Sequence, residues 1–100
     1  MSLTGADLRA RINVLMNSRD ASHEEVAETL TAGYGYALSR DARLVRIERR
    51  ITELAADAEN PEAARELRRL WLEQRSIAAE LTDLREQLGR LRETRFAEAR

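Results

Sequence analysis

The stretch Asp57-Ala58-Glu59-Asn60-Pro61-Glu62 contains the only proline of the 100-residue chain, and it decides the fold. A residue before proline is pushed out of the α-helical region. Asparagine is a good helix N-cap, and proline is favoured at the first helical position. The stretch therefore predicts that one helix ends near Ala58, that a turn spans 59–61, and that a second helix begins at Pro61.

Heptad repeats extend outward from this turn on both sides. Residues 23–58 and 61–98 each carry a seam of a and d positions that is mostly apolar. The seam positions are Val26, Leu30, Gly33, Ala37, Arg40, Leu44, Ile47, Ile51, Leu54 and Ala58 in the first segment, and Leu67, Leu70, Gln74, Ile77, Leu81, Leu84, Leu88, Leu91, Arg95 and Glu98 in the second. Two long helices joined by so short a turn must run antiparallel. We therefore expect a long antiparallel two-helix coiled-coil hairpin.

Folding the hairpin about Asn60 fixes the pairing of core layers. The layers are Leu54 with Leu67, Ile51 with Leu70, Leu44 with Ile77, Ala37 with Leu84, Gly33 with Leu88 and Leu30 with Leu91. The same register places Arg50 beside Glu73 and Arg43 beside Glu80. Arg40 falls in the core and would need a carboxylate, which Glu80, Asp83 or an acid of a partner chain could supply.

Residues 4–18 predict a short amphipathic helix before the hairpin. Thr4 and Asp7 form a capping-box pattern, and the apolar residues Leu8, Ile12, Leu15 and Met16 follow at helical spacing. Ser22 and Glu25 form a second capping box at the start of the hairpin. The chain is thus expected to be one all-α domain over 1–100.

Four apolar residues lie off the seam: Leu38, Val45, Trp71 and Leu72. They form a candidate interaction face, because their burial requires a further element. Helix 4–18 could supply it, although its short connector keeps that helix near the open end of the hairpin and away from Trp71. A second copy of the chain could supply it instead, and we expect a homodimer that completes a four-helix bundle.

The segment Gly33-Tyr34-Gly35-Tyr36 interrupts a strong helix pattern with two glycines, each costing about 1 kcal/mol relative to alanine. One interpretation is a hinge or binding notch that presents the tyrosine hydroxyls. The favoured interpretation is packing, in which Gly33 and Ala37 make room for Leu88 and Leu84 across the hairpin.

Composition excludes several classes of function. Alanine, arginine, leucine and glutamate make up 60 of the 100 residues, as in long helices, and the net charge of −1 argues against a non-specific nucleic-acid binder. Cysteine and lysine are absent, which removes thiolate and Schiff-base chemistry. With one histidine and no motif for a cofactor, we predict neither a metal nor a cofactor site. No apolar stretch is long enough to enter a membrane and no signal peptide is evident, so a cytoplasmic protein is expected.

Three functions follow in order of preference. The first is a non-enzymatic protein–protein interaction module, an adaptor, chaperone or assembly subunit acting through helical faces. The second is a regulator that inserts the acidic tip, Asp57, Glu59 and Glu62, into a larger machine such as RNA polymerase; this arrangement resembles the finger of bacterial transcript-cleavage factors. The third is a small helical-bundle enzyme that binds an anionic ligand through arginines, which resembles the all-helical chorismate mutases in outline.

Overall fold

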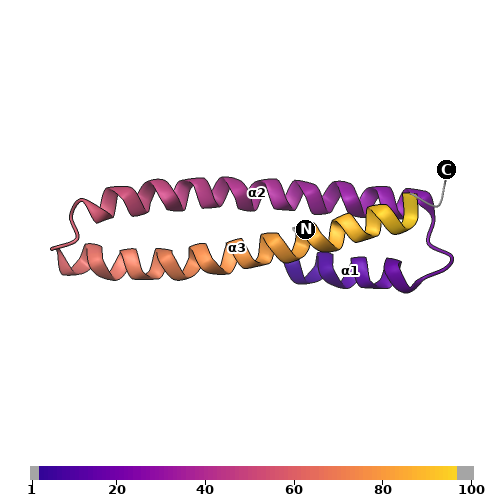
Figure 1. Ribbon diagram of the computed structural model, residues 1–100, viewed down its shortest axis with the longest axis horizontal. Coiled ribbons are helices and arrows are strands. Elements are labelled where there is room, and N and C mark those ends of the chain that lie inside the picture. Colours follow the sequence, from indigo (N-terminus) through magenta and orange to yellow (C-terminus); the bar gives the residue numbers. More distant parts are fainter. Residues whose placement is uncertain (1–2, 97–100) are drawn as a thin grey trace.

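The computed structural model describes residues 3–96 and contains three helices, α1 (Gly5–Asn17), α2 (His23–Ala55) and α3 (Pro61–Phe96). Helices α2 and α3 form a long antiparallel hairpin, and α1 lies beside the C-terminal half of α3 (Figure 1). The molecule measures 58 × 23 × 20 Å. The predicted all-α helical hairpin is confirmed, whereas the end of the last helix at residue 98 and the seam position Glu98 lie outside the described residues.

The turn between α2 and α3 is wider than predicted. Helix α2 ends at Ala55 and not at Ala58, because the Asp57 amide bonds back three residues to the Leu54 carbonyl at 3.0 Å and tightens the last turn. In the same way, the Asn60 amide donates to the Asp57 carbonyl, three residues before it, at 3.0 Å. The start of α3 is as expected, since the Asn60 side chain accepts a hydrogen bond from the Glu62 amide at 3.0 Å and Pro61 is the first helical residue.

The seam of the hairpin is the hydrophobic core. The buried seam residues are Val26, Leu30, Ala37, Ile47, Leu54, Ala63, Leu67, Leu70, Ile77, Leu81, Leu84, Leu88 and Leu91. The expected register is present at Gly33, where a built Cβ would lie 2.5 Å from Cδ2 of Leu88. Leu44 and Ile51 are partly buried and pack against this core.

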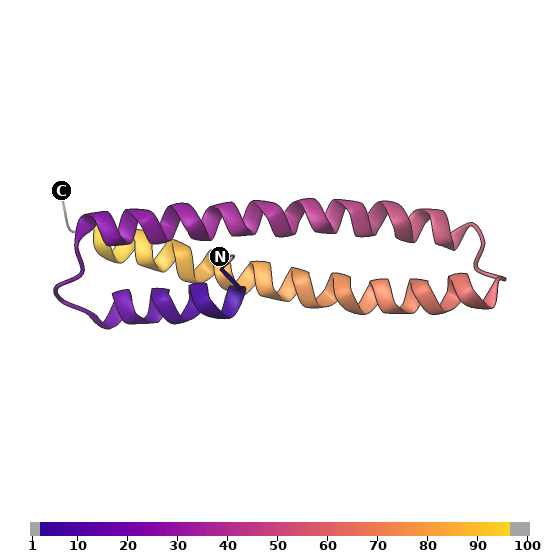
Figure 2. The ribbon, with the colours of Figure 1, turned by 180° about the vertical axis from the view of Figure 1, so that it is seen from behind.

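Helix α1 adds a third layer at one end only. Both predicted capping boxes are formed, at Thr4 for α1 and at Ser22 for α2. Leu8, Ile12 and Leu15 are buried against the open end of the hairpin. The two opposite views agree that the half of the hairpin nearer the turn has no third helix beside it (Figures 1 and 2). The molecule is therefore a three-helix bundle at its open end and a two-helix hairpin toward its tip.

Candidate interaction surfaces

One flank of the hairpin is lined by polar contacts at seven-residue intervals. Tyr36, Arg43 and Arg50 of α2 face Glu80, Glu73 and Glu66 of α3, and we call these six residues the ion-paired flank. The Arg43 guanidinium donates to both oxygens of Glu73 at 2.9 and 3.0 Å. The Arg50 guanidinium donates to both oxygens of Glu66 at 3.1 and 3.2 Å. Such two-point contacts orient the side chains as well as pairing the charges.

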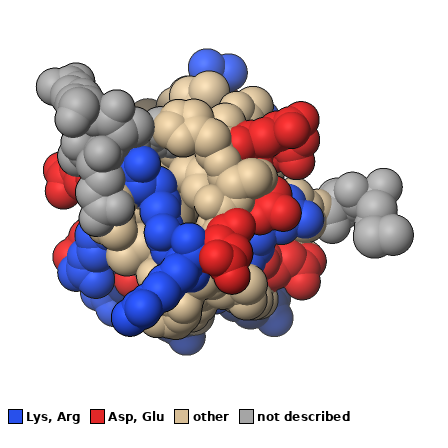
Figure 3. Space-filling model, turned by 90° about the vertical axis from the view of Figure 1, so that its right-hand side faces the viewer, with Lys and Arg blue, Asp and Glu red and all other residues tan. Residues whose placement is uncertain are grey.

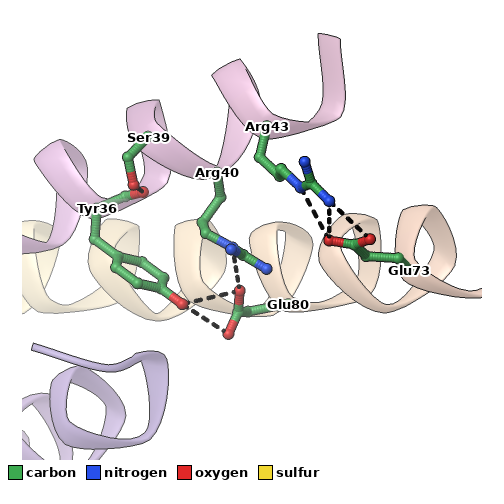
Figure 4. Close-up of polar contacts among 6 residues, drawn as sticks. All are labelled: Tyr36, Ser39, Arg40, Arg43, Glu73 and Glu80. Carbon is green, nitrogen blue, oxygen red and sulfur yellow. Dashed lines mark hydrogen bonds and ion pairs between the residues drawn. The ribbon is translucent and has the colours of Figure 1, made fainter. Parts of the chain in front are cut away.

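These pairs correct the predicted ones, Arg43 with Glu80 and Arg50 with Glu73. Glu80 is held by two other donors, as Figure 4 shows. The Tyr36 hydroxyl donates to Glu80 at 3.0 and 3.1 Å, and Arg40 Nε donates at 3.2 Å. By the Gly33–Leu88 contact, Arg43 is level with residue 78 and Arg50 with residue 71, and each binds the glutamate five residues further toward the tip. The expectation that Glu80 could supply the carboxylate for Arg40 is confirmed.

Tyr36 and Glu80 form a polar cluster that is partly withdrawn from water. Burial raises the pKa of the Tyr36 phenol above its ordinary value of 10.0, and the hydrogen bond to Glu80 and the charge of that carboxylate raise it further. Arg40 and the Gly5 backbone oppose this shift. The phenol therefore stays protonated, and remains a donor to Glu80, over the whole neutral range.

The raised pKa of Tyr36 predicts a loss of stability in alkali. The unfolded chain releases the phenol proton first, so the stabilisation is complete below about pH 10 and is lost as the pH rises through the folded-state pKa. Urea unfolding at about pH 8 and about pH 11 should show a larger loss for the wild type than for Tyr36→Phe. Equal losses in the two proteins would contradict the assigned role of the phenol.

The same cluster receives the N-terminus of α1. Gly5 is the first residue of α1, and a methyl group there would overlap Oε2 of Glu80 and lie 3.2 Å from the Tyr36 hydroxyl. The first amides of a helix carry partial positive charge, which the Glu80 carboxylate complements. A side chain at position 5 would therefore require the Glu80 carboxylate to move.

The C-terminus of α1 is bound by Arg95, which lies on α3 as Glu80 does. Arg95 Nη2 donates to the carbonyl oxygens of Leu15, Met16 and Ser18 at the C-terminal end of α1. Carbonyl groups at a helix C-terminus lack their usual helical partners, and a cation there stabilises them. Glu80 and Arg95 are about 22 Å apart along α3, and the 13 residues of α1 span about 20 Å. The two charged side chains thus lie at the two ends of α1, the acid at its N-terminus and the base at its C-terminus. We call Glu80 and Arg95 the α1 clamp.

The clamp is a feature that analysis of the sequence missed. Two signals pointed to it: a glycine at the start of α1, and an arginine at seam position 95. A third signal lies on the ion-paired flank itself. One heptad beyond Tyr36 and Glu80, the next positions are Thr29, which is 2% exposed, and the neutral Gln87. Helix α1 thus covers this flank where its charged residues give way to neutral ones.

The opposite flank carries the apolar residues that lie off the seam. Tyr36 and Asp41 are five residues apart, about 140° around α2, and so lie on opposite sides of the seam. Asp41 pairs with Arg85 of α3 across this second flank. Leu38 and Val45 lie three and four residues from Asp41 and share its face. On α3, Trp71 lies two heptads before Arg85 and therefore faces the same way.

We call this surface the open flank; it comprises Leu38, Asp41, Val45, Glu48, Trp71, Ala78 and Arg85. Its large apolar side chains are well exposed: Leu38 by 68%, Val45 by 54% and Trp71 by 51%. Leu72, also 62% exposed, points about 100° further around α3 and borders the flank. The structure thus brings Leu38, Val45 and Trp71 onto one side of the hairpin, and α1 lies on the other.

The glycine-rich segment lies inside an unbroken helix. α2 continues through Gly33-Tyr34-Gly35-Tyr36, and every residue of this segment is helical. Gly33 is buried beneath Leu88, as the packing interpretation expects, and the Tyr36 hydroxyl is bound to Glu80. Gly35 faces open space, and a Cβ atom added at this position would have no neighbouring side chain within 4 Å. The notch is therefore filled by the protein's own Leu88.

The acidic tip is exposed and locally bonded. Asp57, Glu59 and Glu62 all lie at the surface. Asp57 Oδ2 accepts from Asn60 Nδ2 at 3.4 Å, and the Glu62 amide is the one that Asn60 caps. Among the described residues, no three histidine, aspartate or glutamate side chains converge in a group able to hold a metal ion.

Charges of both signs lie on the face of the molecule at the open end of the hairpin. Seen from the open end, arginine and acidic side chains lie side by side around apolar and neutral ones (Figure 3). Within the described part of the chain, none of the helices has a stretch both long and apolar enough to span a membrane.

Comparison with known proteins gives no relative. No protein-family model, no curated protein sequence and no solved structure matches the chain.

Proposed function

We propose that this protein is a non-enzymatic protein–protein interaction module whose binding surface is the open flank. The observation that carries the proposal is the half-exposed Trp71, set on the two-helix part of the hairpin in line with Val45 and Leu38. Tryptophan is strongly enriched among the residues that dominate binding energy at protein interfaces. A rigid helical hairpin presents such side chains with little loss of conformational entropy on binding.

The arrangement of the arginines favours this function over an anion-binding enzyme. Arg40, Arg43 and Arg50 point toward α3, and each is paired with a carboxylate there. A ligand anion would have to compete with these intramolecular carboxylates for the guanidinium groups. The alternative hypothesis of an inserted acidic tip is supported only by the exposure of Asp57, Glu59 and Glu62.

Photo-crosslinking in the native cells tests the proposal. Benzoylphenylalanine placed at position 45 or 71 should form a discrete crosslinked adduct, since both positions lie on the open flank. Position 46 is the matched control, because Arg46 is exposed but turned about 100° away from Val45. Adducts from 45 and 71, with none from 46, are the expected result. No adduct at 45 and 71, or equal adducts at all three positions, would overturn the proposal.

A further inference from the structure

We infer that the partner on the open flank is a second copy of this chain, related by a two-fold axis parallel to the long axis of the hairpin. In this arrangement α2 of each copy packs against α3 of the other, and the four long helices form an antiparallel bundle. The inference rests on the proposed function of the open flank as a binding surface, and it identifies the partner.

The first observation is an ion pair that the open flank lacks. Along the ion-paired flank, the contacts Arg43 with Glu73 and Arg50 with Glu66 repeat at seven-residue intervals. On the open flank, Asp41 forms an ion pair with Arg85. A repeat of this pair one heptad toward the tip would join Glu48 to residue 78, but residue 78 is alanine. Glu48 is exposed and takes part in no ion pair among residues 3–96.

The second observation is a pair of arginines that border the open flank on α3. Arg68 and Arg75 lie three residues before and four residues after Trp71, so they border it on α3. Both are exposed, and neither makes an ion pair with any described residue. The open flank therefore has an unpaired acid on α2, and unpaired bases border it on α3.

A two-fold axis parallel to the hairpin brings these charges together. Glu48 is fifteen residues after Gly33, and Glu73 is fifteen residues before Leu88, so the Gly33–Leu88 contact places Glu48 level with residue 73. Because this rotation preserves the level along the axis, Glu48 of one copy lies between the levels of Arg68 and Arg75 of the other. The Trp71 and Val45 side chains of both copies then lie between the hairpins, where contact with one another removes them from water.

The other possible two-fold axis, perpendicular to the hairpin, is disfavoured by the same charges. It would place α2 of one copy against α2 of the other, and α3 against α3. The α2 surfaces that carry Glu48 would then face each other, and so would the α3 surfaces that carry Arg68 and Arg75. Like charges across an interface oppose association and suppress the wrong arrangement. Charge complementarity thus selects both the partner and its orientation.

Paired charge reversals test the arrangement by native mass spectrometry and light scattering. The wild type should have the mass of a dimer, twice 11.4 kDa, at micromolar concentration. Glu48→Arg alone, and Arg68→Glu/Arg75→Glu alone, should each raise the dimer dissociation constant by about tenfold or more. Mixing the two variants should restore a heterodimer, because both α2–α3 contacts between the copies then regain opposite charges. Arg46→Glu, on the side of α2 away from the open flank, should leave the dimer unchanged.

The outcomes separate this inference from the proposed function. A monomeric wild type, or mixed variants that fail to form a heterodimer while each keeps its helical circular dichroism, would overturn the inference. If the crosslinks from positions 45 and 71 then carry a protein of another mass, the open flank still binds a partner and only its identity is wrong. Crosslinked adducts of twice the chain mass, together with heterodimer rescue, support both.

Discussion

Replacing Gly33 with leucine should lower the free energy of unfolding by about 3 kcal/mol. Even a Cβ at position 33 would lie 2.5 Å from Cδ2 of Leu88, and Leu88 is fully buried. Overpacking of a close-packed core forces side chains out of their preferred rotamers. Urea denaturation followed by circular dichroism measures the loss.

The exchange Gly33→Leu/Leu88→Gly provides the internal control. It conserves the volume of the layer and should return stability to within about 1.5 kcal/mol of the wild type. Gly35→Ala is the matched single variant, because position 35 is exposed and has nothing within 4 Å of a built Cβ. It should raise stability by about 1 kcal/mol, the difference in helix propensity. A double variant no more stable than Gly33→Leu would show that Leu88 is not the reason for glycine at position 33.

The seam and the helix starts could be predicted from the sequence because both depend on local patterns. Heptad spacing identified most of the buried leucines, isoleucines and valines of the hairpin, although the predicted seam position Ala58 is exposed; the turn at Asn60 set the register that brings Gly33 under Leu88. The capping boxes at Thr4 and Ser22 involve residues three positions apart, so their chemistry is visible in the sequence. The end of α2 was less predictable, since Asp57 closes a tight turn that no residue type requires.

The position of α1 and the pairing of the arginines could not be predicted. The apolar stripe of α1, Leu8, Ile12 and Leu15, could pack into a groove on either flank. In the structure α1 lies with Gly5 close to Glu80 and with the Leu15 carbonyl bound by Arg95, and these contacts join residues 75 and 80 positions apart in the chain. The ion pairs likewise depend on competition for Glu80, which becomes visible only when Tyr36 and Arg40 are placed beside it.

The open flank was partly predictable. Leu38, Val45 and Trp71 depart from the heptad seam, so the sequence alone marked them as candidates for an interaction face. The sequence did not indicate that Glu48 would lack an ion-pair partner, because the missing partner position, Ala78, is identified only by the observed pairing of Asp41 with Arg85 one heptad away. An apolar residue outside the heptad seam can thus be recognised from the sequence of one helix. A missing ion-pair partner can be recognised only when both helices are placed side by side.

Replacing Glu80 with alanine should lower the free energy of unfolding by about 2–3 kcal/mol and release α1 from the hairpin. The Glu80 side chain is 24% exposed and accepts from the Tyr36 hydroxyl and from Arg40. Its removal leaves both donors without their acceptor and removes the negative charge beside the N-terminus of α1. Urea unfolding measures the total cost. Hydrogen exchange should show faster exchange in the amides of 5–17, with the hairpin amides near the tip unchanged.

Glu73→Ala is the matched control, because Glu73 lies one heptad before Glu80 on the same flank and binds Arg43 but no part of α1. Its side chain is 35% exposed, and such surface pairs contribute about 1 kcal/mol or less. If the Glu80 carboxylate holds the N-terminal end of α1, Glu80→Ala should cost more stability than Glu73→Ala, and the faster hydrogen exchange should be concentrated in α1. Equal costs at the two positions, with unchanged exchange in 5–17, would mean that Leu8, Ile12 and Leu15 hold α1 without the α1 clamp.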